Sequence, residues 1–171
     1  MKKIFISGSI SIKILPEKVV KILDRIIREK FSVLVGDAKG VDLAIQKYFK
    51  QKNYKNVSVV TVCKKPRNLA DKEFKIIIIK VSKNMETKRK LYMQKDIWMA
   101  KNADYLLVIW DGKSKGSFSN IINGIRYKKH IMVYLMPEKR FLTKEELNER
   151  KIKEIYMKYV GYSLRELYSV Y

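Results

Sequence analysis

The feature that most constrains the fold of this chain is a regular alternation of short apolar runs and longer amphipathic stretches. The apolar runs at 3–7, 31–35 and 56–63 have the length of buried strands, and each ends beside glycine or a polar residue. Between them, 17–27 and 40–51 carry apolar residues at helical spacing. Strands joined through helices by short connections are parallel, with right-handed crossovers. This part of the chain therefore predicts a βαβαβ unit.

The second half continues the same pattern. It predicts, in order, a helix, a strand, a helix and a strand at 86–102, 104–110, 118–127 and 131–135. The expected fold class is α/β, a Rossmann-like three-layer αβα sandwich with a mostly parallel sheet and a helical C-terminal appendage. We expect a Rossmann-like nucleotide-binding domain over 1–137 and a C-terminal helical extension of the same domain over 138–171.

Two stretches are less regular. Residues 64–85 begin with a Pro-Arg-Asn break and remain unassigned, although the isoleucine run within 75–81 has the composition of a strand or a sheet edge. The C-terminal stretch 143–171 has helical character, and Thr143 and Glu146 have the spacing of a capping box.

Composition excludes several classes of protein. The chain has 171 residues with a single Cys and a single His, so a disulfide framework and a Cys/His zinc site are both excluded. No apolar run approaches the roughly 18 to 20 residues that span a bilayer, and the N-terminal residues lack the apolar core of a signal peptide. We expect a cytoplasmic protein with no membrane partner, no metal and no certain cofactor.

The net charge is strongly positive. The chain has 38 Lys and Arg against 17 Asp and Glu, which gives +21 at pH 7. This balance is typical of nucleic-acid binders, but the lysines are spread along the whole chain instead of forming one block. The most concentrated stretch is 83–95, with Glu86 as its one acid. Candidate nucleic-acid contacts are the cationic and aromatic residues Lys88, Arg89, Lys90, Tyr92, Lys95 and Trp98.

Three loops, in chain order 7–9, 36–40 and 111–117, should meet at the carboxyl edge of the sheet, where open α/β sheets bind their ligands. They combine glycine with hydroxyl or charged side chains, and two of them lead directly into a helix, whose N-terminus attracts phosphate. Neither the Walker A spacing nor the dinucleotide G-x-G-x-x-G is present. The candidate ligand-binding residues in these loops are Ser7, Gly8, Ser9, Gly36, Asp37, Lys39, Gly40, Asp42, Asp111, Gly112, Ser114, Lys115, Gly116 and Ser117.

Two of these loops resemble a known family. Residues 36–42, Gly-Asp-Ala-Lys-Gly-Val-Asp, and 110–117, Trp-Asp-Gly-Lys-Ser-Lys-Gly-Ser, are similar to loops of the SLOG superfamily. This superfamily includes small YpsA- and YspA-type proteins and the Rossmann-like domain of DNA-processing protein A. Arg89 and Asp96 match an upstream segment of the same proteins and join the ligand-binding candidates. The resemblance covers about 2–135. It implies binding of a nucleotide or nucleotide-derived ligand, such as AMP, ADP-ribose or NAD, by a sensor or carrier.

Enzymatic activity stays open. Related phosphoribohydrolases cleave an N-glycosidic bond with a loop glutamate, and Asn120 stands at the matching position here. An amide cannot ionise, so it cannot serve as a general base. Asp37, Asp42 and Asp111 remain as acids that could position a ribose hydroxyl or activate water. No catalytic residue is assigned, and weak N-glycosidic hydrolysis is kept as an alternative.

Other functions and ordinary structural roles compete with nucleotide binding. The charge favours a single-stranded nucleic-acid-binding module as one alternative. The C-terminal tyrosines 156, 159, 162, 168 and 171 suit an interaction scaffold that docks on another subunit, as in a homo-oligomer, but they are equally consistent with packing back onto their own sheet. Cys63, His130 and Trp110 are more typical of a buried thiol, a strand residue far from the ligand edge and a core aromatic.

Overall fold

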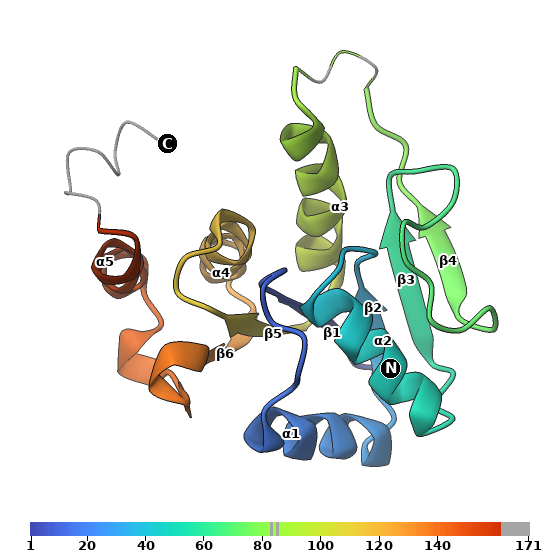
Figure 1. The fold of residues 1–171 in the computed structure, drawn as a ribbon, viewed down its shortest axis with the longest axis horizontal. Helices are drawn as coiled ribbons and strands as arrows, with labels where there is room; N and C mark the ends of the chain where they lie inside the picture. Colours follow the sequence, from blue (N-terminus) through green and yellow to red (C-terminus); the bar gives the residue numbers. More distant parts are fainter. Residues whose placement is uncertain (83, 85, 162–171) are drawn as a thin grey trace.

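Figure 1 shows the fold in the computed structural model, which describes residues 1–82, 84 and 86–161. The strands are β1 Lys3–Gly8, β2 Ser32–Val35, β3 Val57–Thr61, β4 Lys75–Ile78, β5 Tyr105–Trp110, β6 His130–Leu135 and β7 Arg140–Phe141. The α-helices are α1 Glu17–Arg28, α2 Val41–Gln51, α3 Lys88–Asn102, α4 Lys115–Arg126 and α5 Glu149–Val160. Short 3-10 turns cover Met136–Glu138 and Lys144–Glu146.

The strands form one sheet in the order β4-β3-β2-β1-β5-β6-β7. Every pairing is parallel except that of β6 with β7, which is a short antiparallel hairpin that the sequence did not predict. The order reverses at β1, which pairs with β2 on one side and β5 on the other. The expected α/β fold class is confirmed, and the carboxyl end of β1, where the strand order reverses, is the position where open α/β sheets generally bind ligands.

The strand residues alternate between two apolar layers because successive side chains of a strand point to opposite faces. Ile4 and Ile6 pack in the layer with α1 and α2, whereas Phe5 packs in the layer with α3. A third cluster joins α4 and α5 to the β5–β6 end of the sheet. In Figure 1, α1 and α2 lie on one face of the sheet, with α3 and α4 on the other.

The previously unassigned stretch supplies a sheet edge. β4 pairs in parallel with β3, and Ile76 and Ile78 are 41% and 52% exposed, because the strand has a neighbour on one side only. Exposed Lys75 and Lys80 flank this run. Lysines at an edge strand discourage pairing with a second chain.

The C-terminal stretch is helical in its described part. Thr143 and Glu146 form the predicted capping box, and Asn148 caps α5 by accepting a hydrogen bond from the backbone N–H of Lys151. The ring of Tyr156 is buried and stacks on that of Phe118, 4.5 Å between centroids. Tyr156 therefore packs back onto its own chain, which is the alternative to the scaffold role, while residues 162, 168 and 171 lie outside the described residues. The division into 1–137 and 138–171 stays a prediction.

No helix among the described residues has the length and apolar character needed to span a membrane.

Candidate functional site

The first and third predicted loops meet at the carboxyl edge of the sheet. The side-chain oxygens of Ser9 and Ser114 share a hydrogen bond of 2.9 Å, although 105 residues separate them in the chain. Ser9 also accepts a hydrogen bond from the backbone N–H of Asp111, 3.0 Å long. These contacts bring the end of β1 against the turn before α4, as the parallel order of β1 and β5 requires.

A cavity of about 390 Å³ lies beside this contact, between α3 and α4. Its size falls in the range of small-molecule sites. The predicted site residues that line it are Ser7, Gly8, Asp42, Arg89, Asp96, Ser114, Gly116 and Ser117. Its other lining residues are Ile10, Ala38, Arg67, Lys88, Tyr92, Met93, Lys95 and Asn120.

The other predicted site residues do not line this cavity, and several of them shape the loops instead. The carboxylate of Asp111 accepts hydrogen bonds from the backbone N–H groups of Lys113 and Ser114, both 2.8 Å, which is how an aspartate forms a turn. Asp37 is buried and accepts hydrogen bonds from the hydroxyl of Thr61, at the end of β3, and from the backbone N–H of Arg67. The residues outside the lining are Ser9, Gly36, Asp37, Lys39, Gly40, Asp111, Gly112 and Lys115.

Gly36 and Gly116 show two different reasons for a glycine at this edge. A Cβ on Gly36 would lie 2.4 Å from Oδ2 of Asp42 and 2.9 Å from Nζ of Lys95, so the protein itself requires glycine there. A Cβ on Gly116 would meet nothing within 4 Å. Gly116 lies in the first turn of α4 and lines the cavity, so its small size leaves room for a ligand at the helix N-terminus.

The floor of the cavity is a buried polar cluster. Nζ of Lys95, which is 4% exposed, donates to Oδ1 of Asp96 at 2.8 Å. The side chain of Asn120 donates to Ser7 at 3.2 Å and to Asp96 at 3.4 Å. Asn120 thus lies at the candidate site as a hydrogen-bonding amide. Asp42 accepts from the backbone N–H of Ala38 at 3.1 Å.

The charges of this cluster are unequal, because two carboxylates face one ammonium group. Burial raises the pKa of Asp42 to about 7, against the attraction of Lys95. Burial acts to lower the pKa of Lys95, but the carboxylates of Asp96 and Asp42 raise it overall. The pKa values of both groups are raised because Asp96 makes the short ion pair with Lys95, whereas Asp42 is less well compensated by that ammonium group.

The rim of the cavity is cationic and partly aromatic. Lys88 and Arg89 occupy the first turn of α3, where Thr87 caps the helix by accepting from the backbone N–H of Lys90. Tyr92 follows one turn later, and all three line the cavity. Among the other predicted nucleic-acid contacts, Lys90 pairs with Glu86 and Trp98 packs against the core. Lys95 lines the cavity as a buried residue of its floor and not as an exposed residue of the rim.

The sequence interpretation missed Arg67 altogether. It lies in the segment between β3 and β4, and its guanidinium donates to the carboxylate of Asp37 at 2.7 and 3.2 Å. Burial alone would raise the pKa of Asp37, but the hydrogen bonds from Arg67 and Thr61 hold it below its usual value. The Pro-Arg-Asn break offered no signal for this role, because the partner is 30 residues away in the chain.

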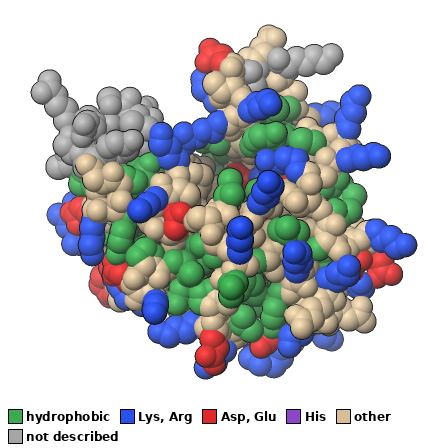
Figure 2. Space-filling view, in the orientation of Figure 1, with side chains coloured by type: hydrophobic (Ala, Val, Ile, Leu, Met, Phe, Trp, Pro, Cys, Tyr) green, Lys and Arg blue, Asp and Glu red, His purple; other side chains and the backbone are tan. Residues whose placement is uncertain are grey.

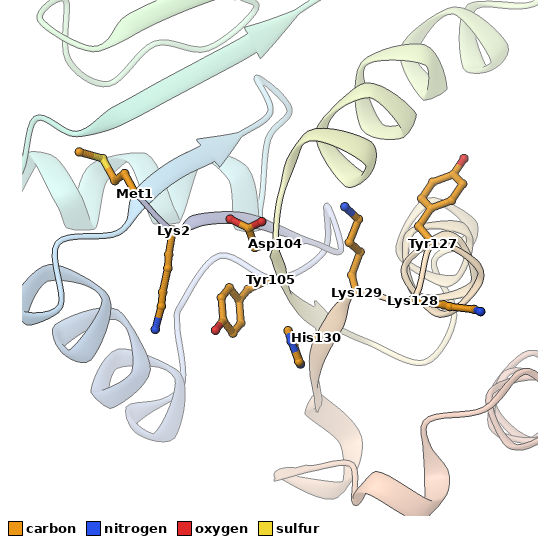
Figure 3. A pocket seen from close by; sticks show the side chains of 8 residues that line it. All are labelled: Met1, Lys2, Asp104, Tyr105, Tyr127, Lys128, Lys129 and His130. Atoms are coloured by element: carbon orange, nitrogen blue, oxygen red, sulfur yellow. The ribbon is translucent and has the colours of Figure 1, made fainter.

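A second concavity, of about 550 Å³, lies at the opposite, amino-terminal edge of the sheet. Figure 3 shows its lining side chains in two groups, with Tyr127 and Lys129 directed away from Tyr105 and His130. Tyr105 packs with the layer of α1 and α2, whereas Tyr127 packs with the layer of α3. Because these side chains do not converge, the carboxyl-edge cavity is the better candidate. His130 begins β6 at this far edge, as the sequence predicted.

Of the remaining sequence candidates, Cys63 is only partly buried, so the expectation of a buried thiol is wrong. Trp110 is fully buried, and its indole N–H donates to the carbonyl of Ser114 at 3.2 Å. This core side chain therefore helps to fix the backbone of the loop at 111–117. Among the described residues, no group of three or more His, Cys, Asp or Glu could hold a metal ion. Figure 2 shows Lys and Arg side chains spread over the visible face, so the positive charge is diffuse there.

The fold has a known counterpart among solved structures. It is similar to DNA processing protein A from Helicobacter pylori, whose structure is described as giving insights into a unique single-stranded DNA binding mode. The two share 15% sequence identity and a TM-score of 0.61, over 94% of this chain and 80% of that chain. The fold is Rossmann-like. No protein-family model matches the chain, and no curated protein matches its sequence.

Proposed function

We propose that this protein binds single-stranded nucleic acid at the carboxyl edge of its sheet, with one nucleotide unit in the cavity between α3 and α4. The observation that carries the proposal is the rim: Lys88 and Arg89 flank a cavity that also receives the N-terminus of α4 at Gly116. Guanidinium groups and helix N-termini both bind phosphate oxygens. The similarity in fold to a structure described with single-stranded DNA supports the same assignment.

The shape of the site favours a single strand over a duplex. A cavity of about 390 Å³ has room for one unpaired nucleotide. A paired base stays inside its helix unless unstacking energy is supplied, at a cost of a few kcal/mol. The net charge of +21 adds long-range attraction for any phosphate backbone.

Charge reversal tests the rim. We expect the double variant Lys88→Glu/Arg89→Glu to weaken binding of a labelled single-stranded oligonucleotide, measured by fluorescence anisotropy across a salt series. For single strands, each lost phosphate contact makes the negative slope of log binding constant against log salt concentration shallower by about 0.7. Two lost contacts should therefore make the slope of the double variant shallower by about 1.4.

The matched control is Lys72→Glu/Lys75→Glu, which makes the same change of charge at two exposed lysines near the amino end of β4. It should shift affinity only weakly and leave the slope close to that of the wild type. If both variants lose affinity and slope equally, the charge acts diffusely and the rim is not the binding site.

A free nucleotide-derived ligand is the second candidate, and the cavity floor favours it. The carboxylates of Asp42 and Asp96 are hydrogen-bond acceptors of the kind that hold ribose hydroxyls. Thermal unfolding with AMP or ADP-ribose, at low and high salt, tests it, because a ligand of the native state raises the melting temperature. A shift that survives high salt and disappears in Gly116→Val supports this candidate. Strand binding without any such shift counts against it.

A further inference from the structure

Arg67 and Tyr92 form a stacked pair in the wall of the cavity. The guanidinium carbon of Arg67 lies 4.0 Å from the centroid of the Tyr92 ring. Arg67 comes from the segment between β3 and β4, and Tyr92 comes from α3, so the pair joins two elements across one side of the site. The side chain of Arg67 is 32% exposed and Tyr92 is half-buried, which leaves part of the pair accessible.

The pair is held in place before any ligand arrives. Asp37, whose side chain is 1% exposed, accepts from Nε, Nη2 and the backbone N–H of Arg67. The neighbouring Asn68 donates to the backbone carbonyl of Asp37 at 2.8 Å. Gln46 of α2 binds the carbonyl of Asn68 and the N–H of Ala70. A side chain fixed in this way loses little conformational entropy when it binds a ligand.

This pairing also limits what Arg67 offers to a ligand. One edge of its guanidinium, formed by Nε and Nη2, already donates to Oδ1 of Asp37, and this carboxylate offsets its charge. A phosphate would compete with a buried carboxylate for the same donors. Each group covers one face of the other, so what the pair can offer a nucleobase is the outward flat face of the guanidinium or of the Tyr92 ring, and both kinds of face stack on nucleobases.

We propose that the Arg67–Tyr92 pair is a stacking platform for an unpaired nucleobase, so that the site distinguishes base-bearing single strands from other polyanions. This inference rests on the proposed function. It assigns recognition of the base to the Arg67–Tyr92 pair, whereas the cationic rim recognises the phosphates. Phosphate contacts alone attract any polyanion to a chain of net charge +21. Stacking requires an exposed base and tolerates every sequence, because each base has a π face.

The experiment compares two oligomers with the same number of phosphates. One is an oligothymidylate of about 12 nucleotides, within the usual range of single-strand site sizes, and the other carries a tetrahydrofuran abasic unit at every position. We expect the wild-type protein to prefer the base-bearing oligomer by about 5- to 100-fold. Tyr92→Leu should bring this ratio close to one, and Tyr92→Phe, which keeps the ring, should retain it.

Tyr127→Leu is the matched control. Tyr127 is also a half-buried tyrosine beside a cation, with Nζ of Lys101 5.7 Å from its ring, but it lies at the opposite edge of the sheet. Tyr127→Leu should leave the ratio of the affinities for the base-bearing and abasic oligomers unchanged. Thermal unfolding checks that each variant is folded. If Tyr92→Leu is not, Arg67→Lys serves instead, because it keeps the charge, removes the flat face and should lower the same ratio.

The outcomes separate the two proposals. If the wild-type protein binds both oligomers equally, or if Tyr92→Leu keeps the preference, the stacking platform is overturned while strand binding through phosphates stands. If neither oligomer binds at low salt, the proposed function is overturned and this inference falls with it.

Discussion

At the scale of single residues, Asp42 is the group whose chemistry the fold changes most. The unfolded chain releases its proton near pH 4, whereas burial raises the native pKa to about 7. Between these two pH values, the native state therefore holds one more proton than the unfolded chain. The stability that this proton contributes is fully present below about pH 4 and is lost as the pH rises through about 7. Asp42→Asn removes this dependence. Urea denaturation measures the free energy of unfolding of both proteins at about pH 5 and about pH 8. Between these pH values, the wild type should lose about 2 kcal/mol more of this free energy than Asp42→Asn does. Parallel curves for the two proteins would contradict the raised pKa.

At the scale of elements, the partly buried ion pair of Asp37 with Arg67 is one of the contacts that hold the segment between β3 and β4, beside the hydrogen bonds of Gln46 and Asn68. Asp37→Asn should destabilise the protein by about 1 to 3 kcal/mol, because the partly buried guanidinium of Arg67 loses a charged acceptor. It should also speed cleavage by trypsin within 62–74, since Asp37 fastens this segment to the sheet. Urea denaturation and timed proteolysis measure both effects. Glu29→Gln removes the charge of an exposed pair with Arg25 and should destabilise the protein much less than Asp37→Asn does. Equal effects of the two variants would show that Asp37 does not hold the segment.

At the scale of the whole molecule, the net charge of +21 acts on stability and on binding with opposite signs. Excess positive charge repels itself in the compact state, and salt screens that repulsion. Raising NaCl from about 20 mM to about 300 mM should raise the melting temperature by a few degrees, at about 2 to 4 °C per kcal/mol. The same change should weaken oligonucleotide binding. Scanning calorimetry and anisotropy on one preparation measure both. A melting temperature that falls with salt would mean that local ion pairs outweigh the general repulsion.

The order of helices and strands, the parallel sheet and the edge at which three loops end were all predictable from the sequence. Periodicity and turn residues are local signals, and the 31–35 run predicted β2 because its neighbours in the chain determine it. The capping box at Thr143 was predictable for the same reason.

Only the tertiary structure decided which residues face the cavity. The pairing of Asp37 with Arg67, the burial of Lys95 and the raised pKa of Asp42 depend on contacts between elements distant in the chain. The sequence carries no local signal for such contacts, because they arise when the sheet closes and α2, α3 and the β3–β4 segment pack around one point. Asp37 precedes α2 and Asp42 lies in its first turn, yet the pKa of Asp37 is lowered and that of Asp42 is raised, because the guanidinium of Arg67 donates to Asp37 whereas burial dominates at Asp42.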